Sequence, residues 1–256
     1  GTIEVYQIGT TGQVDTVLQG SDLLVKVKPV NGYQLLDVTC NGTSQMSQME
    51  SGNEFRVNGV NENITIVATF VKKPVVTFSV VTPTGEEAHG SLTANNLPIS
   101  DSPITVSYGY KNAITFTATP GTGYEVDKWT VNTTEVNGQK VANSDNQTYT
   151  YTPNAETGIT SDLTVTVSFK ALPKATVEFS VVDKNNETDG GFDGTIQATV
   201  ARNGQSAPSG KVTSGTLTNV YRDSKVTFAA EPADGYKVTK WLLNGEAQTT
   251  PPVLDI

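Results

Sequence analysis

The sequence contains almost none of the residues on which most metal sites and nucleophilic catalysts depend. Its 256 residues include one cysteine, Cys40, and one histidine, His89. A disulfide within the chain is therefore excluded, and so is a zinc site made of several cysteine and histidine ligands. A histidine-dependent triad would have to use His89, and a cysteine–histidine pair would have to join two distant parts of the chain. We expect a solvated loop histidine and a buried structural thiol.

Basic residues, long apolar runs and helical patterns are also scarce. Lysine and arginine total 17 against 26 acidic residues, which gives a formal net charge of −9. Nucleic acid is not an expected partner, because phosphate binding requires clustered cations and no basic stripe with interleaved aromatic residues occurs. No apolar run approaches the roughly 18–20 residues that span a bilayer, so we expect no membrane insertion in this segment. The absence of helical periodicity favours an all-β chain.

What the sequence does contain is a phrase, Pro-x-x-Gly-Tyr, that occurs three times. The second and third copies continue to a tryptophan, and the first continues to Val38 in its place. The copies are Pro29, Gly32 and Tyr33; Pro120, Gly123, Tyr124 and Trp129; and Pro232, Gly235, Tyr236 and Trp241. A phrase that recurs at long intervals indicates a repeated structural unit, so the sequence predicts three related domains.

Each copy of the phrase follows a segment in which apolar and polar residues alternate, as in Ile114, Phe116 and Ala118. Such alternation predicts a strand with one face in a core. Proline then ends the strand and glycine makes a turn. A β-bulge near Asp127–Lys128, and another near Thr239–Lys240, would turn each tryptophan to the face of the preceding tyrosine. We therefore expect both aromatic residues of the phrase to be buried.

These patterns predict an all-β fold of three tandem small domains, β-grasp-like or sandwich-like, arranged as an elongated rod. The predicted domains are residues 1–72, 75–171 and 175–256, called the first, second and third units below. The linkers between them are short and contain proline, which favours a semi-rigid connection. The first unit lacks the strand that opens the others, and the third lacks the closing strand. We expect the chain to be a piece of a longer repeat array.

The spaced positions of the phrase, followed by Asn-Gly and a closing strand that ends Val-x-Val-x-Phe, resemble the divergent internalin-type B repeats of bacterial cell-surface and secreted proteins. The resemblance is closest in residues 90–170, good in 194–245 and weaker in 1–70, where Val38 stands in place of the tryptophan. It implies small β-rich domains related to the β-grasp arrangement, an extracellular or cell-wall location, and a role as stalk, spacer or adhesion-associated module. It implies no catalysis, no cofactor and no particular ligand.

One acidic loop is a candidate calcium site. Oxygen-bearing side chains alternate along it at Asp183, Asn185, Asp189 and Asp193. However, Thr188 occupies the position where an EF-hand loop requires glycine, and no flanking helices are predicted. A flexible acidic hairpin loop is the alternative interpretation.

Two pairs of tyrosines are candidate sugar-binding surfaces, because residues two apart on a strand share one face. Tyr149 and Tyr151 correspond to apolar positions of the first unit, so we expect them to pack in a core. Tyr108 and Tyr110 flank Gly109 in a predicted turn and remain candidate ligand contacts. We expect Trp129 and Trp241 to anchor the cores of their units.

The sequence therefore favours a non-catalytic stalk or spacer segment of a bacterial surface or secreted protein, associated with adhesion. The alternative is a carbohydrate-binding module of a secreted glycan-degrading protein. The partners to expect are a host or bacterial surface protein, a glycan, or neighbouring domains of a longer chain. A hydrolase is not expected, because the acidic residues form no paired motif. The loops that differ most between copies, residues 132–147 and 201–214, are where a specific function should lie.

Overall fold

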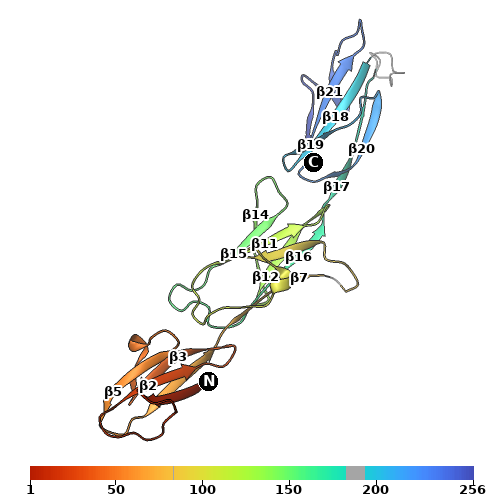
Figure 1. Cartoon of the computed structure of the whole chain (residues 1–256). Coiled ribbons are helices and arrows are strands. Elements are labelled where there is room, and N and C mark those ends of the chain that lie inside the picture. The colour runs from red at the N-terminus through yellow and green to blue at the C-terminus, as the bar shows by residue number, and fades with distance from the viewer. Residues whose placement is uncertain (83, 183–193) are drawn as a thin grey trace.

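The computed structural model describes residues 1–82, 84–182 and 194–256. These residues form strands and two short 3-10 turns, η1 (Met46–Gln48) and η2 (Ile99–Asp101), and contain no α-helix. The prediction of an all-β chain is confirmed. Nowhere in the described ranges does a helix have the length and apolar character needed to cross a bilayer. Figure 1 shows the three units one after another, with the N-terminus in the first and the C-terminus in the third.

The second unit is built from two five-stranded sheets. One has the order β10 (Ile104–Thr105), β7 (Val75–Val81), β16 (Leu163–Ala171), β12 (Tyr124–Val131) and β13 (Thr134–Val136). The other has the order β14 (Gln139–Lys140), β15 (Gln147–Tyr151), β11 (Ile114–Pro120), β8 (Gly90–Ala94) and β9 (Leu97–Pro98). Strands β16 and β7 run parallel, and the other paired strands of the described residues run antiparallel. Both sheets contribute to one buried cluster, with Phe78 and Trp129 from the first and Phe116 from the second. This arrangement is the sandwich-like one of the two alternatives.

The first unit has the same plan with fewer strands. One sheet has the order β1 (Thr2–Gln7), β2 (Ser21–Lys28) and β5 (Glu54–Val60), and the other has the order β4 (Thr43–Ser44), β3 (Tyr33–Cys40) and β6 (Ile66–Lys72). Its fully buried residues are Val25, Val27, Val38 and Phe55. Cys40 ends β3 and is only half-buried, which raises the pKa of its thiol through desolvation.

The third unit has one four-stranded sheet and two separate strand pairs. The sheet has the order β19 (Gln205–Pro208), β18 (Gly194–Arg202), β21 (Lys225–Pro232) and β24 (Val253–Asp255). The pairs are β17 (Lys174–Ser180) with β20 (Ser214–Tyr221), and β22 (Trp241–Leu243) with β23 (Glu246–Gln248). Among the described residues of this unit, the buried cluster comprises Val177, Ala198, Val220 and Val226. This core is smaller than that of the second unit.

The bulge predicted in the second unit is confirmed, because the pairing of β12 with β16 shifts between Val126 and Lys128. It turns Trp129 into the core, where 1% of the side chain is exposed. The bulge predicted at Thr239–Lys240 is wrong. Residues 236–240 lie outside any strand, and β22 begins only at Trp241. A bulge requires a paired neighbour, and the described part of the third unit has no counterpart of β16 beside this segment.

The expectation that the tyrosines of the phrase are buried is also wrong. Tyr33 and Tyr236 are 42% and 54% exposed. Tyr124 is half-buried and stacks on His89, with ring centroids 4.0 Å apart and planes 9° from parallel. These tyrosines directly follow the turn, and Tyr33 and Tyr124 are the first residues of β3 and β12. The histidine accordingly lies against an aromatic ring instead of projecting freely into solvent.

Candidate functional site

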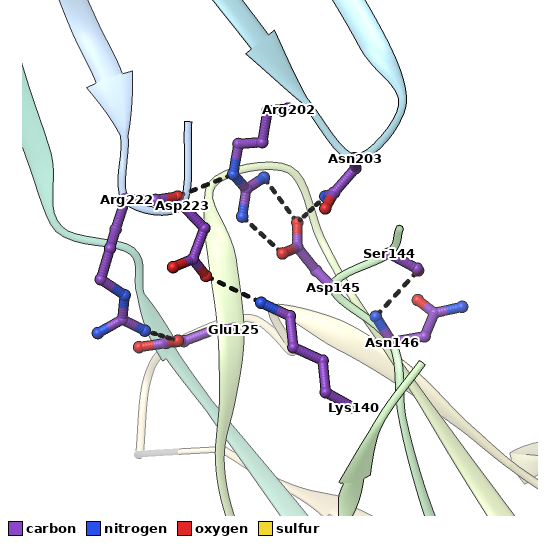
Figure 2. A network of polar contacts seen from close by, with 9 residues as sticks. All are labelled: Glu125, Lys140, Ser144, Asp145, Asn146, Arg202, Asn203, Arg222 and Asp223. Carbon is purple, nitrogen blue, oxygen red and sulfur yellow. Dashed lines mark hydrogen bonds and ion pairs between the residues drawn. The ribbon is translucent and has the colours of Figure 1, made fainter. Parts of the chain in front are cut away.

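The two loop segments that differ most between copies meet at the boundary between the second and third units. Residues 132–147 approach this boundary from the second unit and residues 201–214 from the third (Figure 2). Their contacts, together with those of the β20–β21 turn, form a network of charged side chains. This network, called the second joint below, is the candidate functional site.

A tight hairpin positions the acidic residue at the centre of the second joint. Strands β14 and β15 pair, and the Val141 backbone N–H donates to the Asn146 carbonyl at 2.8 Å. Inside this turn the Asn146 N–H donates to Ser144 Oγ at 3.1 Å, while Asn143 adopts a positive φ of 54°. Asparagine tolerates that left-handed conformation better than most residues. The hairpin therefore presents Asp145 toward the third unit.

Asp145 binds the third unit through a two-point contact with Arg202. The guanidinium Nη1 and Nη2 atoms donate to its two carboxylate oxygens at 2.7 and 2.5 Å, and Asn203 Nδ2 donates at 3.0 Å. The Arg202 Nε atom also donates to the Arg222 carbonyl at 3.0 Å, which fixes the orientation of the guanidinium. Only 16% and 21% of the Arg202 and Asp145 side chains are exposed. A two-point, shielded ion pair is stronger and less screened by salt than an exposed one.

Further ion pairs flank this contact on the same boundary. Lys140 Nζ donates to Asp223 Oδ2 at 2.8 Å, and Arg222 pairs with Glu125 on β12 (Figure 2). Opposite charges therefore face each other at three places along the boundary. Three basic and three acidic side chains of this acidic chain therefore pair across the boundary.

An aromatic ring from the third unit closes the second joint. Lys174 Nζ and Arg202 Cζ lie 5.2 and 5.7 Å from the centroid of the Tyr221 ring, which is within range for cation–π attraction. The same ring approaches Gly123, so that a Cβ atom at this glycine would lie 2.8 Å from the Tyr221 hydroxyl oxygen. Gly123 also has a φ of +83°. Both the close approach and the backbone conformation require glycine here.

Each of the two linkers makes a corresponding pair of backbone hydrogen bonds, one to the preceding unit and one to the following unit. After the first unit, the Lys73 N–H donates to the Gly32 carbonyl at 2.8 Å, and the Pro74 carbonyl accepts from Val106 at 3.0 Å. After the second unit, the Leu172 N–H donates to the Gly123 carbonyl at 2.9 Å, and the Pro173 carbonyl accepts from Arg222 at 2.9 Å. Each linker is thus bonded to the phrase glycine of the preceding unit and to the residue that directly follows a strand, β10 or β20, of the following one.

The boundary between the first and second units, called the first joint below, has neutral contacts and one exposed ion pair. The Gln34 side chain accepts from the Tyr108 N–H at 2.8 Å and donates to the Tyr108 carbonyl at 3.4 Å. Asp162 accepts from the Val75 N–H at 2.9 Å and from Lys72 Nζ at 3.1 Å. The first joint therefore combines a side-chain amide with one exposed ion pair, whereas the second has three ion pairs, one of them shielded.

Comparison with known protein families finds a match over two segments of the chain. Residues 80–173 and 195–253, more than half of the sequence, match the family described as the divergent InlB B-repeat domain. The chain belongs to this family. The resemblance inferred from the repeated phrase is therefore confirmed for the second and third units, and the matched ranges contain all six residues of the three ion pairs of the second joint.

Two further comparisons add no assignment to this B-repeat chain. Among solved structures, the crystal structure of the pilus adhesin SpaC from Lactobacillus rhamnosus GG aligns with 92% of this chain at 12% identity and a TM-score of 0.30. The B-repeat chain covers 37% of the length of that adhesin. A comparison with curated proteins found no match.

Sequence reasoning missed one joint position of the B-repeat phrase. The residue directly after the tyrosine lies outside the repeated phrase, yet Gln34 and Glu125 both occupy this position and both contact the next unit. Their shared place in the phrase was the available signal. Arg202 and Asp145 lie in segments that the comparison of copies did single out, but no pattern in the sequence paired them.

The candidate ligand tyrosines take structural positions in the B-repeat units. Tyr149 packs against Trp129 and Phe116, with ring centroids 6.0 and 6.4 Å apart, and desolvation raises the pKa of its hydroxyl. Tyr110 and Tyr151 pack against the same cluster, and the Tyr108 backbone lies in the first joint.

The calcium candidates Asp183, Asn185, Asp189 and Asp193 lie outside the described residues. Within residues 1–82, 84–182 and 194–256, no group of three or more metal-ligating side chains occurs.

The acidic residues of both joints predict how cohesion depends on pH. Hydrogen bonding from Lys140, and then the charges of Lys140, Arg222 and Arg202, lower the pKa of Asp223 below its ordinary 3.8. The Val75 N–H and Lys72 lower that of Asp162 in the same way. A lowered pKa means that the stabilisation is fully present above about pH 4 and is lost as pH falls through the lowered pKa. Inter-unit distances measured by scattering should therefore stay constant from pH 5 to 8 and lengthen only below about pH 4. A change between pH 5 and 8 would contradict this account.

Proposed function

We propose that this chain is a non-catalytic stalk segment of a bacterial surface or secreted protein, where it spaces adhesion-related domains from their anchor. Membership of the B-repeat family supports a repeat segment of this kind. The observation that carries the proposal is the repeated linker geometry, in which each linker is bonded to the units on both sides. A spacer needs fixed joints, because a loose linker lets a chain fold back on itself.

The free energies of the side-chain contacts in the two joints also support a fixed arrangement of the units. A hydrogen bond to a charged group contributes roughly 1.5–3 kcal/mol when it is shielded from solvent, and an exposed ion pair contributes about 0–1 kcal/mol. The two-point contact of Asp145 with Arg202 belongs to the first kind. Lys140 and Asp223, about half exposed, belong to the second. Since the units are already tethered, a few kcal/mol is enough to hold one arrangement for most of the time.

Sedimentation velocity tests the stalk proposal directly. The chain should sediment as a monomer with a frictional ratio well above that of a compact protein of 27.2 kDa. The ratio should change little when the salt concentration is raised moderately, because shielded contacts and backbone hydrogen bonds carry most of the cohesion. A frictional ratio typical of a globule would count against a spacer role.

A glycan array addresses the carbohydrate-binding alternative. The stalk proposal predicts no saturable binding, because three of the four candidate tyrosines, Tyr110, Tyr149 and Tyr151, are engaged in packing. Dose-dependent binding to one glycan class that survives in several salt conditions would favour the binding module instead.

A single backbone amide reports whether the first joint is closed. The Tyr108 N–H donates to the Gln34 side chain, which belongs to the preceding unit. We expect this amide to be protected from hydrogen exchange in the native chain, and Gln34→Ala to raise its exchange rate by about 10-fold or more, as loss of about 1.5 kcal/mol implies. The amide of Gly109 donates to Ile159 within the second unit and is the matched control. If Tyr108 exchanges freely in the native chain, the first joint is open in solution.

A further inference from the structure

The strands that begin and end the second unit lie next to each other. Strand β7 is the first strand of this unit and β16 is the last, and they pair in parallel over six residue pairs, from Leu163 opposite Val76 to Ser168 opposite Val81. The first unit is joined to the start of β7, and the third unit is joined to the end of β16. Tension that passes along the chain therefore enters the second unit on one of these two strands and leaves it on the other.

The parallel direction of this pair decides how tension acts on it. The linker before β7 lies at the end of the pair where Leu163 begins β16, and the linker after β16 lies at the opposite end. Tension therefore pulls the two strands past each other along their own length. Because the ladder hydrogen bonds run from strand to strand, they must all give way together under such shear. If the two strands were antiparallel, both linkers would lie at the same end, and the bonds would break one after another.

Packing on both sides of the pair also opposes sliding. Strand β16 pairs with β12 over seven further residue pairs, and β7 pairs with β10. The core-facing side chains of the two strands are exposed by 2% or less, and they are Val76, Phe78, Leu163, Val165 and Val167. A slip by one residue would turn them toward solvent, because side chains alternate between the two faces of a strand. Sliding therefore disrupts the core as well as the hydrogen bonds.

Hydrogen bonds also hold the points at which tension enters and leaves the unit. At the start of β7, the Val75 N–H donates to Asp162 Oδ1 at 2.9 Å, and Asp162 directly precedes β16. After the end of β16, the Leu172 N–H donates to the Gly123 carbonyl at 2.9 Å, and this glycine directly precedes β12. Either strand can be peeled from its loaded end only after these bonds have broken.

We propose that the β7–β16 pair is a mechanical clamp, which makes the second unit resist extension when the chain is under tension. Resistance to force is set by the barrier to unfolding and not by the equilibrium stability of the unit. In the second unit that barrier is the simultaneous rupture of six residue pairs in shear. The inference rests on the pairing of two strands and does not depend on the stalk proposal.

Two pulling directions on the same unit test the clamp by single-molecule force spectroscopy of the whole chain. In a Cys40→Ser background, one variant carries attachment points at Lys73→Cys and Lys170→Cys, which load the β7–β16 pair in shear. The matched control carries Lys73→Cys and Ser161→Cys, which place both attachment points at the same end of the pair. The thermal transition of the second unit should be the same in both variants, so that a difference in force reports the pulling direction alone.

The unfolding force of the shear variant should exceed that of the control by about three-fold or more at the same pulling speed, because the residue pairs resist together in the first and one after another in the second. Equal forces in the two directions, or a higher force in the control, would overturn the proposal.

Pulling the unaltered chain by its two ends gives an independent check. Unfolding of the second unit is recognised by the length that residues 75–171 release, at most about 3.6 Å per residue. This release should occur at the force of the shear variant. If it occurs at the lower force of the control, β7 and β16 do not carry the load together and the clamp is rejected.

Discussion

Replacement of Trp129 by alanine should destabilise the second unit by about 3–5 kcal/mol, which is most of the stability of a domain of this size. The side chain is 1% exposed and contacts Tyr149 with ring centroids 6.0 Å apart. A Cβ atom at Gly138 would lie 2.3 Å from its indole nitrogen, so the ring fills its site closely. Alanine would leave a large cavity that two hydrogen-bonded sheets cannot collapse to fill.

Calorimetry and two matched variants test this expectation. The thermal transition of the second unit should fall by about 12 °C or more in Trp129→Ala. Trp129→Phe should cost much less, because the indole nitrogen has no hydrogen-bond partner among the described residues and phenylalanine retains an aromatic ring. Trp241→Ala should also cost less, since Trp241 is only half-buried. Equal losses for Trp129→Ala and Trp241→Ala would contradict the difference between the two cores.

Breaking the contact between Asp145 and Arg202 should loosen the second joint without unfolding either unit. Arg202→Ala removes the two-point contact and the bond to the Arg222 carbonyl. A double-mutant cycle with Asp145→Ala should give a coupling free energy of about 1–3 kcal/mol, because the pair is shielded and charge-assisted. Most of the free energy that the pair contributes to the second joint should therefore be lost already in Arg202→Ala alone.

Distances between spin labels measure this effect most clearly. Labels on cysteines introduced at Thr164 in the second unit and Thr216 in the third, in a Cys40→Ser background, should give one narrow distance distribution that broadens in Arg202→Ala. Lys211→Ala is the control, because the Lys211–Glu231 pair lies within the third unit and both side chains are more than half exposed. A distribution equally broad in the native chain would show that the joint is not closed.

The sequence predicted the fold wherever local chemistry is decisive. Strict alternation marked the buried strands, and the changed phase between Val126 and Trp129 predicted a bulge that the structure confirms. Predictions failed where burial depends on a neighbour that no local pattern describes. Tyr33 and Tyr236 are apolar enough for a core, but they directly follow the turn and remain 42% and 54% exposed.

The joints were predictable in place but not in detail. Short proline-containing linkers indicated restricted connections, and comparison of the copies indicated the two loop segments that meet at the second joint. The contact between Asp145 and Arg202 could not be predicted, because the two residues are 57 positions apart and any of the chain's acidic residues could have served equally well by composition. Which side chains pair across a boundary depends on the relative orientation of two whole units. Local periodicity in the sequence does not predict that orientation.

Small-angle X-ray scattering of the native chain tests the central claim, that bonded linkers and side-chain contacts hold the three units in an extended row. The account predicts a radius of gyration at least about one and a half times the roughly 18 Å of a compact 256-residue globule. It also predicts a pair-distance distribution with a long tail, fitted by one arrangement of the units and unchanged from pH 5 to 8. A radius near the compact value, or scattering that requires a broad ensemble of bent arrangements, would contradict it.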